Sequence, residues 1–161
     1  MGMNIREQLQ QTLDSINPAN VKNSQPQTVT LAHHTGQFDA ELVALDSMAC
    51  RATNVQLLNS RFEKSSMSEL RQVAQQLASR LIYLLEPITP IEIDEDQVTV
   101  QLRSNPPLRD EDGRQYYELL VSRSGLRLCR YRQAAEKSRE NIPADLTREI
   151  LCRLAEDFLT V

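Results

Sequence analysis

The spacing of apolar residues predicts a helix at the start of the chain. Four apolar residues between positions 3 and 16 recur every three or four residues: Ile5, Leu9, Leu13 and Ile16. This spacing places them on one face of an amphipathic helix. A polar stretch over residues 17–27 follows and has the composition of a linker. We therefore expect the first helix to dock loosely or to swap onto a partner chain.

Strict alternation of apolar and polar residues then predicts strands. It flanks a turn around Gly36, which favours a β-hairpin. If His33 faces Phe38 across the turn, one face of the hairpin holds six residues: Val29, Leu31, His33, Phe38, Ala40 and Leu42. A third strand is expected over residues 49–58. Both of its faces carry apolar and polar side chains, so its register with the neighbouring strands cannot be assigned.

The clearest helix signal lies between residues 66 and 84. Ser66 and Glu69 form a capping-box pattern, and five apolar residues follow at helical spacing: Leu70, Val73, Leu77, Leu81 and Leu84. We expect this stripe at the centre of the core. Pro87 and Pro90 end the helix, and the next residues predict a hairpin in which Ile93 faces Val98 and Ile91 faces Val100.

The last part of the chain predicts two more strands and a helix. The strands lie near residues 114–122 and 126–133, joined by a tight turn for which Gly125 is suited. In this hairpin Val121 faces Leu126 and Leu119 faces Leu128 on the core side, with Tyr117 opposite Arg130 in a cation–π contact. Asn141 and Pro143 indicate a helix start, followed by an apolar stripe: Leu146, Ile150, Leu154 and Phe158.

These elements predict a single α+β domain over residues 1–161. Its antiparallel β-sheet has about seven strands (3+4) packed with three helices, in the order αβββαββββα. Met1 and Gly2 resemble a remnant of an expression vector, so we expect Met3 to be the natural start. The element order and the acidic charge resemble the small dimeric chaperones of type III secretion systems. No residue motif carries this resemblance, and no functional residue is transferred from it.

Composition and charge indicate which classes of partner the protein is unsuited to bind. The net charge of −4 argues against a nucleic-acid or anionic-membrane binder, because both need a basic surface. The charge is uneven, since residues 1–100 hold 7 basic and 12 acidic side chains whereas residues 101–161 hold 11 and 10. Cys50, Cys129 and Cys152 are widely spaced and odd in number, which favours reduced thiols in a cytoplasmic protein.

The sequence Asp110–Gly113 looks like part of a calcium loop. With Gly113 at the sixth position of an EF-hand loop, the first and twelfth positions fall on Leu108 and Leu119, which have no ligand oxygen. We therefore interpret Asp110, Glu111 and Asp112 as a solvated turn between strands. We expect no metal and no cofactor.

His33 and His34 are the only histidines and lie near Asp39 and Glu41. In the predicted hairpin these side chains point in different directions, which disfavours a metal or acid–base site. The cysteines fall on strand and helix patterns, where thiols act as small hydrophobic residues. A small-molecule-binding domain, or an enzyme that uses His33 and His34, remains the alternative to a non-catalytic protein.

One face of the strands near residues 114–133 carries both apolar and polar side chains. Opposite the core side, Leu120 pairs with Arg127 and Tyr116 pairs with Tyr131. Tyrosine and arginine dominate the energies of protein interfaces. We therefore predict that Tyr116, Leu120, Arg127 and Tyr131 bind a partner protein or a second copy, unless the third helix covers them. The predicted function is a non-catalytic protein-interaction module of adaptor or chaperone type, self-associating as a homodimer.

Overall fold

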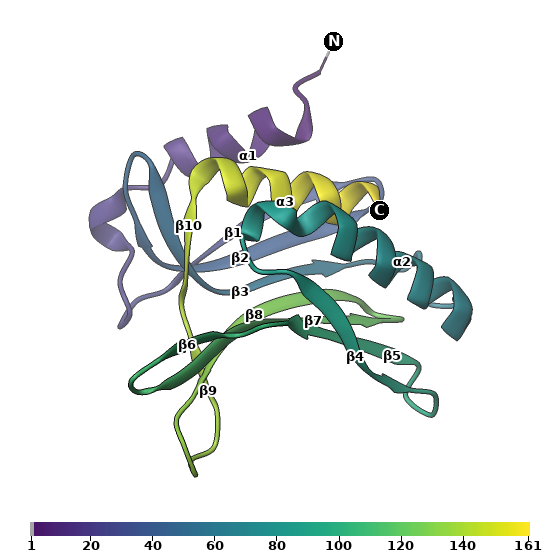
Figure 1. Ribbon diagram of the computed structural model, residues 1–161. Coiled ribbons are helices and arrows are strands. Elements are labelled where there is room, and N and C mark those ends of the chain that lie inside the picture. Colours follow the sequence, from purple (N-terminus) through teal and green to yellow (C-terminus); the bar gives the residue numbers. More distant parts are fainter. Residues whose placement is uncertain (1) are drawn as a thin grey trace.

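The computed structural model describes residues 2–161 and confirms an α+β fold with three helices and a large antiparallel sheet (Figure 1). The helices are α1 (Ile5–Asp14), α2 (Met67–Arg80) and α3 (Arg148–Thr160), with short 3-10 turns η1 (Pro18–Asn20) and η2 (Leu81–Leu84). The strands are β1 (Gln27–His33), β2 (Gly36–Leu45), β3 (Ala49–Leu58), β4 (Ile88–Asp94), β5 (Thr99–Ser104), β6 (Leu108–Asp110), β7 (Gly113–Ser122), β8 (Gly125–Gln133), β9 (Glu140–Ile142) and β10 (Ala144–Thr147).

One continuous sheet runs through the molecule, in the order β1-β2-β3-β8-β7-β5-β4. Strands β9 and β10 pair with β8 and β3, respectively, and β6 pairs with β7. The expected count of about seven strands is therefore wrong, because the sheet has ten. The additional strands are β6, β9 and β10, each of three or four residues. Such short segments show no alternation that a sequence pattern can reveal.

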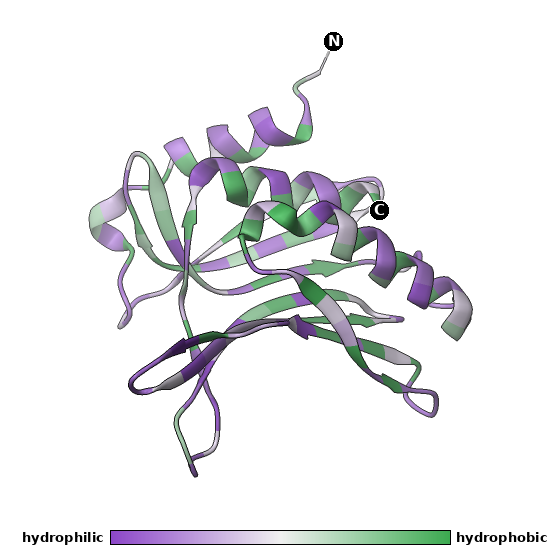
Figure 2. Ribbon diagram, in the orientation of Figure 1, coloured by the Kyte–Doolittle hydropathy of each residue, from purple (hydrophilic) through white to green (hydrophobic). Residues whose placement is uncertain are grey.

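All three helices lie on one face of the sheet, and the core lies between the two layers (Figure 1). Apolar and polar residues alternate along the strands, as expected for a sheet buried on one side (Figure 2). Helix α1 packs on α3 and β1, and its residues Leu9 and Leu13 are fully buried. Within this chain, α1 is thus a docked part of the helical layer.

Helix α2 follows its sequence signals closely. Ser66 accepts a hydrogen bond from the backbone of Glu69 in a capping box. The predicted stripe faces the core, since Leu70, Leu77 and Leu81 are buried, as is Leu84 in η2, and Val73 is half-buried. The prediction of a central core helix is confirmed.

The last helix begins later than Asn141 and Pro143 suggest. The chain first runs as β9 and β10, which fill the space where β3 and β8 diverge, and α3 starts at Arg148. Thr147 is its N-cap and accepts a hydrogen bond from the backbone of Ile150. The expected start was wrong because Asn141 fits a cap by residue type, whereas the strand partners that hold it are distant in sequence.

Two hairpin registers also differ from expectation. In β1–β2, Leu31 rather than His33 faces Phe38, and in β4–β5, Ile93 faces Val100 rather than Val98. Next to each turn the shift equals two residues and leaves the same side chains on the same face. Ile91, expected opposite Val100, lies at an irregularity between Pro90 and Glu92 and has no partner in β5. The predicted β3 bounds and the β7–β8 register are confirmed. At Gly125, with φ +146°, an added Cβ would meet the Leu57 carbonyl oxygen at 1.8 Å, so a larger residue cannot fit.

Candidate interaction surfaces

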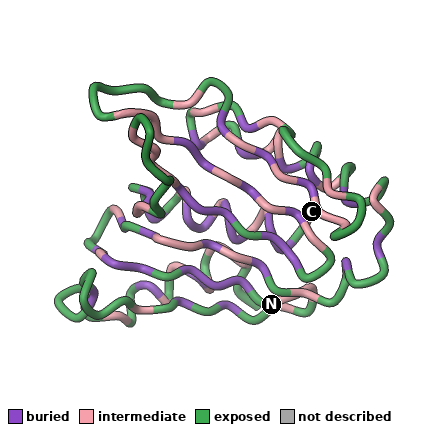
Figure 3. Tube along the Cα trace, turned by 90° about the horizontal axis from the view of Figure 1, so that it is seen from below, coloured by how far each residue is buried: buried purple, intermediate pink, exposed green. Residues whose placement is uncertain are grey.

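The face of the sheet away from the helices is open (Figure 3). Polar side chains cross its strands in a chain of hydrogen bonds. Arg127 of β8 donates to Asn54 of β3 at 3.1 Å, and Asn54 donates to Gln56 at 3.3 Å. Gln56 donates to Asp39 of β2 at 3.5 Å, and Asp39 also accepts from Gln37 at 3.1 Å. The third helix, which packs on the opposite face, does not cover it. We call this the outer face.

Glu118 of β7 is the centre of the charged part of the outer face. Its carboxylate accepts hydrogen bonds from Arg103 of β5, at 3.2 Å, and from Arg139 in the connection between β8 and β9. Burial alone raises the pKa of Glu118, but the hydrogen bonds and charge of Arg139, helped by Arg103, lower it below its usual value. Glu118 is therefore ionised at neutral pH and holds this connection against the sheet.

An aromatic pair lies beside Glu118. The ring centroids of Tyr116 and Tyr131 are 6.1 Å apart. The guanidinium carbon of Arg103 lies 4.5 Å from the Tyr116 ring centroid, and that of Arg139 lies 3.9 Å from the Tyr131 ring centroid. The guanidinium carbon of Arg114 also lies 5.8 Å from the Tyr116 ring centroid. Tyr116 is consequently only 1% exposed, and its contact with a partner stays a prediction.

The other three predicted contact residues lie on the outer face. Arg127 is exposed, and Leu120 and Tyr131 are half-buried. They come from β7 and β8, and Leu120 pairs with Arg127 as predicted. Their contact with a partner stays a prediction.

On the core side of the same hairpin, Arg130 lies over the ring of Tyr117, with its guanidinium carbon 4.6 Å from the centroid. This confirms the predicted cation–π pair. Arg130 is buried, and its charge is balanced by Glu86 at 2.9 Å. The pair therefore belongs to the edge of the core.

A second surface was not predicted from the sequence. Four of the eight large apolar side chains that are exposed in residues 2–161 lie within η2, β4 and their connection: Ile82 (75%), Leu85 (88%), Ile91 (47%) and Ile93 (38%). We call these four residues, which share one segment of the chain between positions 82 and 93, the η2–β4 surface. Strand β4 is the last strand of the sheet, so one of its sides has no neighbouring strand. Exposed apolar groups of this kind often mark protein interaction sites.

The chain segment that carries the η2–β4 surface is acidic. Residues 81–102 contain five carboxylates and no lysine or arginine. Glu86 is paired with Arg130, and Glu95 lies 4.0 Å from Arg71 of α2. Glu92 and Asp96 are exposed. A partner that covers the apolar side chains is thus favoured if it brings positive charge.

The sequence pattern does not predict this surface, because its first residues belong to a run of apolar residues that follows α2. The helical spacing correctly places Leu81 and Leu84 in the core, but the same spacing turns Ile82 and Leu85 outward. Leu85 ends η2 in a left-handed conformation with φ +65°, which is unusual for leucine. An apolar residue at an outward position of a helical stripe is the signal that could have revealed it.

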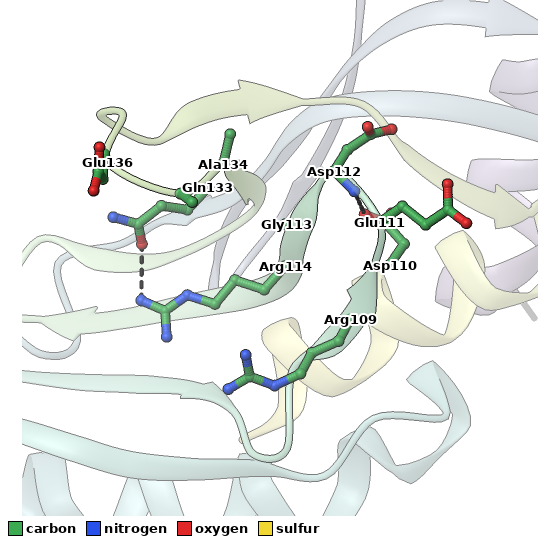
Figure 4. Close-up of a pocket in the computed structure, with 10 residues that line it drawn as sticks. Arg109, Asp110, Glu111, Asp112, Gly113, Arg114, Gln133, Ala134 and Glu136 are labelled. Atoms are coloured by element: carbon green, nitrogen blue, oxygen red, sulfur yellow. Dashed lines mark hydrogen bonds between the residues drawn. The ribbon is translucent and has the colours of Figure 1, made fainter.

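The acidic sequence Asp110–Gly113 forms a turn between β6 and β7. The Asp110 carboxylate accepts a hydrogen bond from the Asp112 backbone at 2.9 Å, and Asp110 pairs with Gly113. The predicted turn is therefore confirmed. With residues 133–136 it lines an open depression of about 460 Å³, across which Arg114 donates to Gln133 at 2.8 Å (Figure 4).

Within residues 2–161, no group of three or more histidine, cysteine, aspartate or glutamate side chains is arranged to hold a metal ion. The Asp110–Gly113 turn forms no such group. His33, His34, Asp39 and Glu41 form none either.

His33 has a local structural role. Its Nδ1 lies 2.7 Å from the Thr35 hydroxyl, and that hydroxyl donates to the Leu159 carbonyl of α3 at 2.7 Å. Burial, together with the charges of His34 and Arg61, lowers the pKa of His33. The His34 ring is 4.1 Å away, centroid to centroid. His33 therefore helps to join the hairpin turn to the C-terminal helix.

The three cysteines are free and buried. Burial raises the pKa of Cys50 to about 12 and also raises the pKa of Cys152. A thiol with such a pKa is protonated at neutral pH and is a poor nucleophile. Cys129 donates a weak hydrogen bond to Asn54 at 3.4 Å on the outer face. These positions suit packing rather than thiol chemistry.

Comparisons with protein-family models, curated proteins and solved structures find no match to this chain. The resemblance to type III secretion chaperones is thus limited to the order of helices and strands. None of the helices described in residues 2–161 is long and apolar enough to cross a membrane.

Proposed function

We propose that the protein is a non-catalytic protein-interaction module of adaptor or chaperone type, which binds a partner protein and also associates with itself. The observation that carries this proposal is the η2–β4 surface, with its four exposed large apolar side chains. Burying one such side chain fully is worth about 1.5–3 kcal/mol. A partner that covers several of them gains binding free energy without any rearrangement of the core.

The chemistry of the surface indicates the kind of partner. The acidic residues around it favour a protein segment that presents apolar side chains beside lysine or arginine. A second copy docked on the same surface brings further carboxylates against Glu92 and Asp94, and this repulsion disfavours it. Self-association therefore uses a different part of the molecule.

The described side chains support a binding role over a catalytic one. The Cys50 and Cys152 thiols have raised pKa values because they are buried, so they are protonated at neutral pH. His33 is hydrogen-bonded to Thr35 within its own hairpin turn. Leu120, Arg127 and Tyr131 on the outer face form a second proposed contact surface.

The proposal is tested by comparing matched variants in affinity capture from the native lysate. The double substitution Leu85→Ser and Ile91→Ser should lower the amount of captured partner at least about tenfold, the equivalent of 1.4 kcal/mol. The control is Met48→Ser, which removes a 74% exposed apolar side chain in the turn between β2 and β3. Equal capture by all three chains contradicts the proposal.

Charge reversal provides a second comparison. Glu92→Lys with Asp94→Lys should weaken capture and reduce its dependence on salt, since the acidic surroundings are lost. Glu111→Lys with Asp112→Lys makes the same change in net charge at the β6–β7 turn, and it should leave capture unchanged.

A further inference from the structure

The main strand order of the sheet ends in two edge strands, β1 and β4, and these differ in how they are protected. A free edge exposes unpaired backbone groups that can pair with another strand. On β4, Pro90 lacks a backbone N–H, and the register with β5 shifts between Pro90 and Glu92. The acidic residues Glu92 and Asp94 also lie on this strand. Proline, irregular register and charge are the devices by which natural proteins block strand pairing at an edge.

Strand β1, at the other edge, has none of these devices. Its seven residues, QTVTLAH, include no proline and no Asp, Glu, Lys or Arg. Its register with β2 is regular from Gln27 opposite Leu42 to His33 opposite Gly36. Threonine and valine favour strands. This strand is the outermost one on its side of the sheet. The edge is therefore long, regular and uncharged at neutral pH.

The turn next to β1 determines which backbone groups are free. A two-residue loop joins β1 to β2, so His33 and Gly36 form the hydrogen-bonded pair that closes it. Hydrogen-bonded and non-hydrogen-bonded pairs alternate from there. Thr28, Thr30 and Ala32 consequently direct their N–H and C=O groups away from β2, and the side chains of all three are exposed.

We propose that β1 pairs antiparallel with β1 of a second copy, about a two-fold axis at Thr30. In this register Thr30 faces Thr30 of the other chain, and Val29 faces Leu31. Val29 and Leu31 are both core residues, so the apolar layer continues from one chain into the other. The strand carries no charge that would repel its own copy. The acidic β4 edge lacks this self-complementarity.

The arrangement closes at two chains. Once the two β1 strands are paired, the main strand order of the joined sheet ends at both sides in a protected β4 strand, and a further edge strand, β6, has only three residues. A two-fold pairing of identical edges therefore gives a dimer rather than a fibre. The inference rests on the self-association proposed above, but it is independent of the η2–β4 surface, which lies at the opposite edge of each sheet.

The test uses the position on the axis. Thr30→Lys and Thr30→Glu each bring two like charges together, so each variant alone should show a dimer dissociation constant raised on the order of tenfold or more. An equimolar mixture of the two variants brings opposite charges together and should form dimers again. Gln75→Lys, exposed on helix α2 on the opposite face of the sheet, should dimerise like the unmodified chain. Sedimentation velocity over a concentration series measures all five samples, the unmodified chain included.

Each outcome decides the inference. Dimers of the unmodified chain that dissociate in either Thr30 variant and re-form in the mixture support it. A monomeric unmodified chain, dimers that persist in Thr30→Lys, or assemblies larger than a dimer overturn it. Thermal melting confirms that the variants fold. Capture of the partner by Thr30→Lys separates the two proposals, because loss of dimers with unchanged capture leaves the η2–β4 binding function intact.

Discussion

Glu86 forms an ion pair with Arg130, with 2.9 Å between Oε2 and Nη2. The pair joins the connection after η2 to β8 in the middle of the sheet. Leu85, the most exposed residue of the η2–β4 surface, is the neighbour of Glu86 in sequence. The ion pair thus fixes the position of this surface relative to the core.

Replacing Glu86 with Ala should destabilise the fold by about 3–5 kcal/mol, because it leaves the buried Arg130 charge without a partner. Chemical denaturation followed by circular dichroism measures the change. The control is Asp145→Ala, which breaks the exposed Arg51–Asp145 pair and should cost less than about 1 kcal/mol. Equal effects of the two substitutions would show that the Glu86 pair is not structurally important.

Leu77 lies at the centre of the α2 stripe and is fully buried. Leu77→Ala should lower the free energy of unfolding by about 2–5 kcal/mol through lost burial and a cavity. Ile82→Ala, on the same helical stretch but 75% exposed, should change it by less than about 0.5 kcal/mol. An unchanged melting temperature for Leu77→Ala would refute the placement of the stripe in the core.

Cys50 makes stability depend on alkaline pH. Its pKa is raised to about 12 from 9.0 by burial, so the unfolded chain loses the thiol proton before the folded chain does. Its contribution to stability is complete below about pH 9 and is lost as the pH rises toward 12. Cys50→Ala should reduce the fall in unfolding free energy between pH 9 and 11. A variant with the same pH slope as the unmodified chain contradicts this assignment.

The outer face offers a separate test. Arg127→Ala with Tyr131→Ala should weaken partner capture or self-association while the melting temperature stays nearly constant, because neither side chain is fully buried. Tyr116→Ala should instead destabilise the fold by about 3–5 kcal/mol, as a fully buried aromatic side chain is lost. If the double variant unfolds, or binds and associates unchanged, the outer face is not a contact surface.

The sequence predicts those parts of the fold that depend on local patterns. The β7–β8 register follows from the turn at Gly125 and the alternation that ends in Leu119 and Val121. The β1–β2 and β4–β5 registers could not be derived this way. A shift of two residues keeps every side chain on its face, so only the length of the turn distinguishes the alternatives.

Non-local contacts explain the rest. Strands β9 and β10 form because β3 and β8 diverge, and no pattern within residues 140–147 encodes that gap. Tyr116 was correctly placed opposite Tyr131, but its burial depends on Arg103 and Arg139, which come from other parts of the chain. The η2–β4 surface was missed because Ile82 and Leu85 belong to an apolar run that otherwise fills the core.

The most direct test of the binding function is site-specific photocrosslinking. A photoreactive amino acid replaces Leu85 in one chain and Met48 in another, and both chains are irradiated in native cells. We expect one dominant crosslinked protein from position 85 that is absent from position 48, with a basic and apolar segment at the attachment site. Crosslinks of equal yield from both positions, or none from position 85, would contradict it.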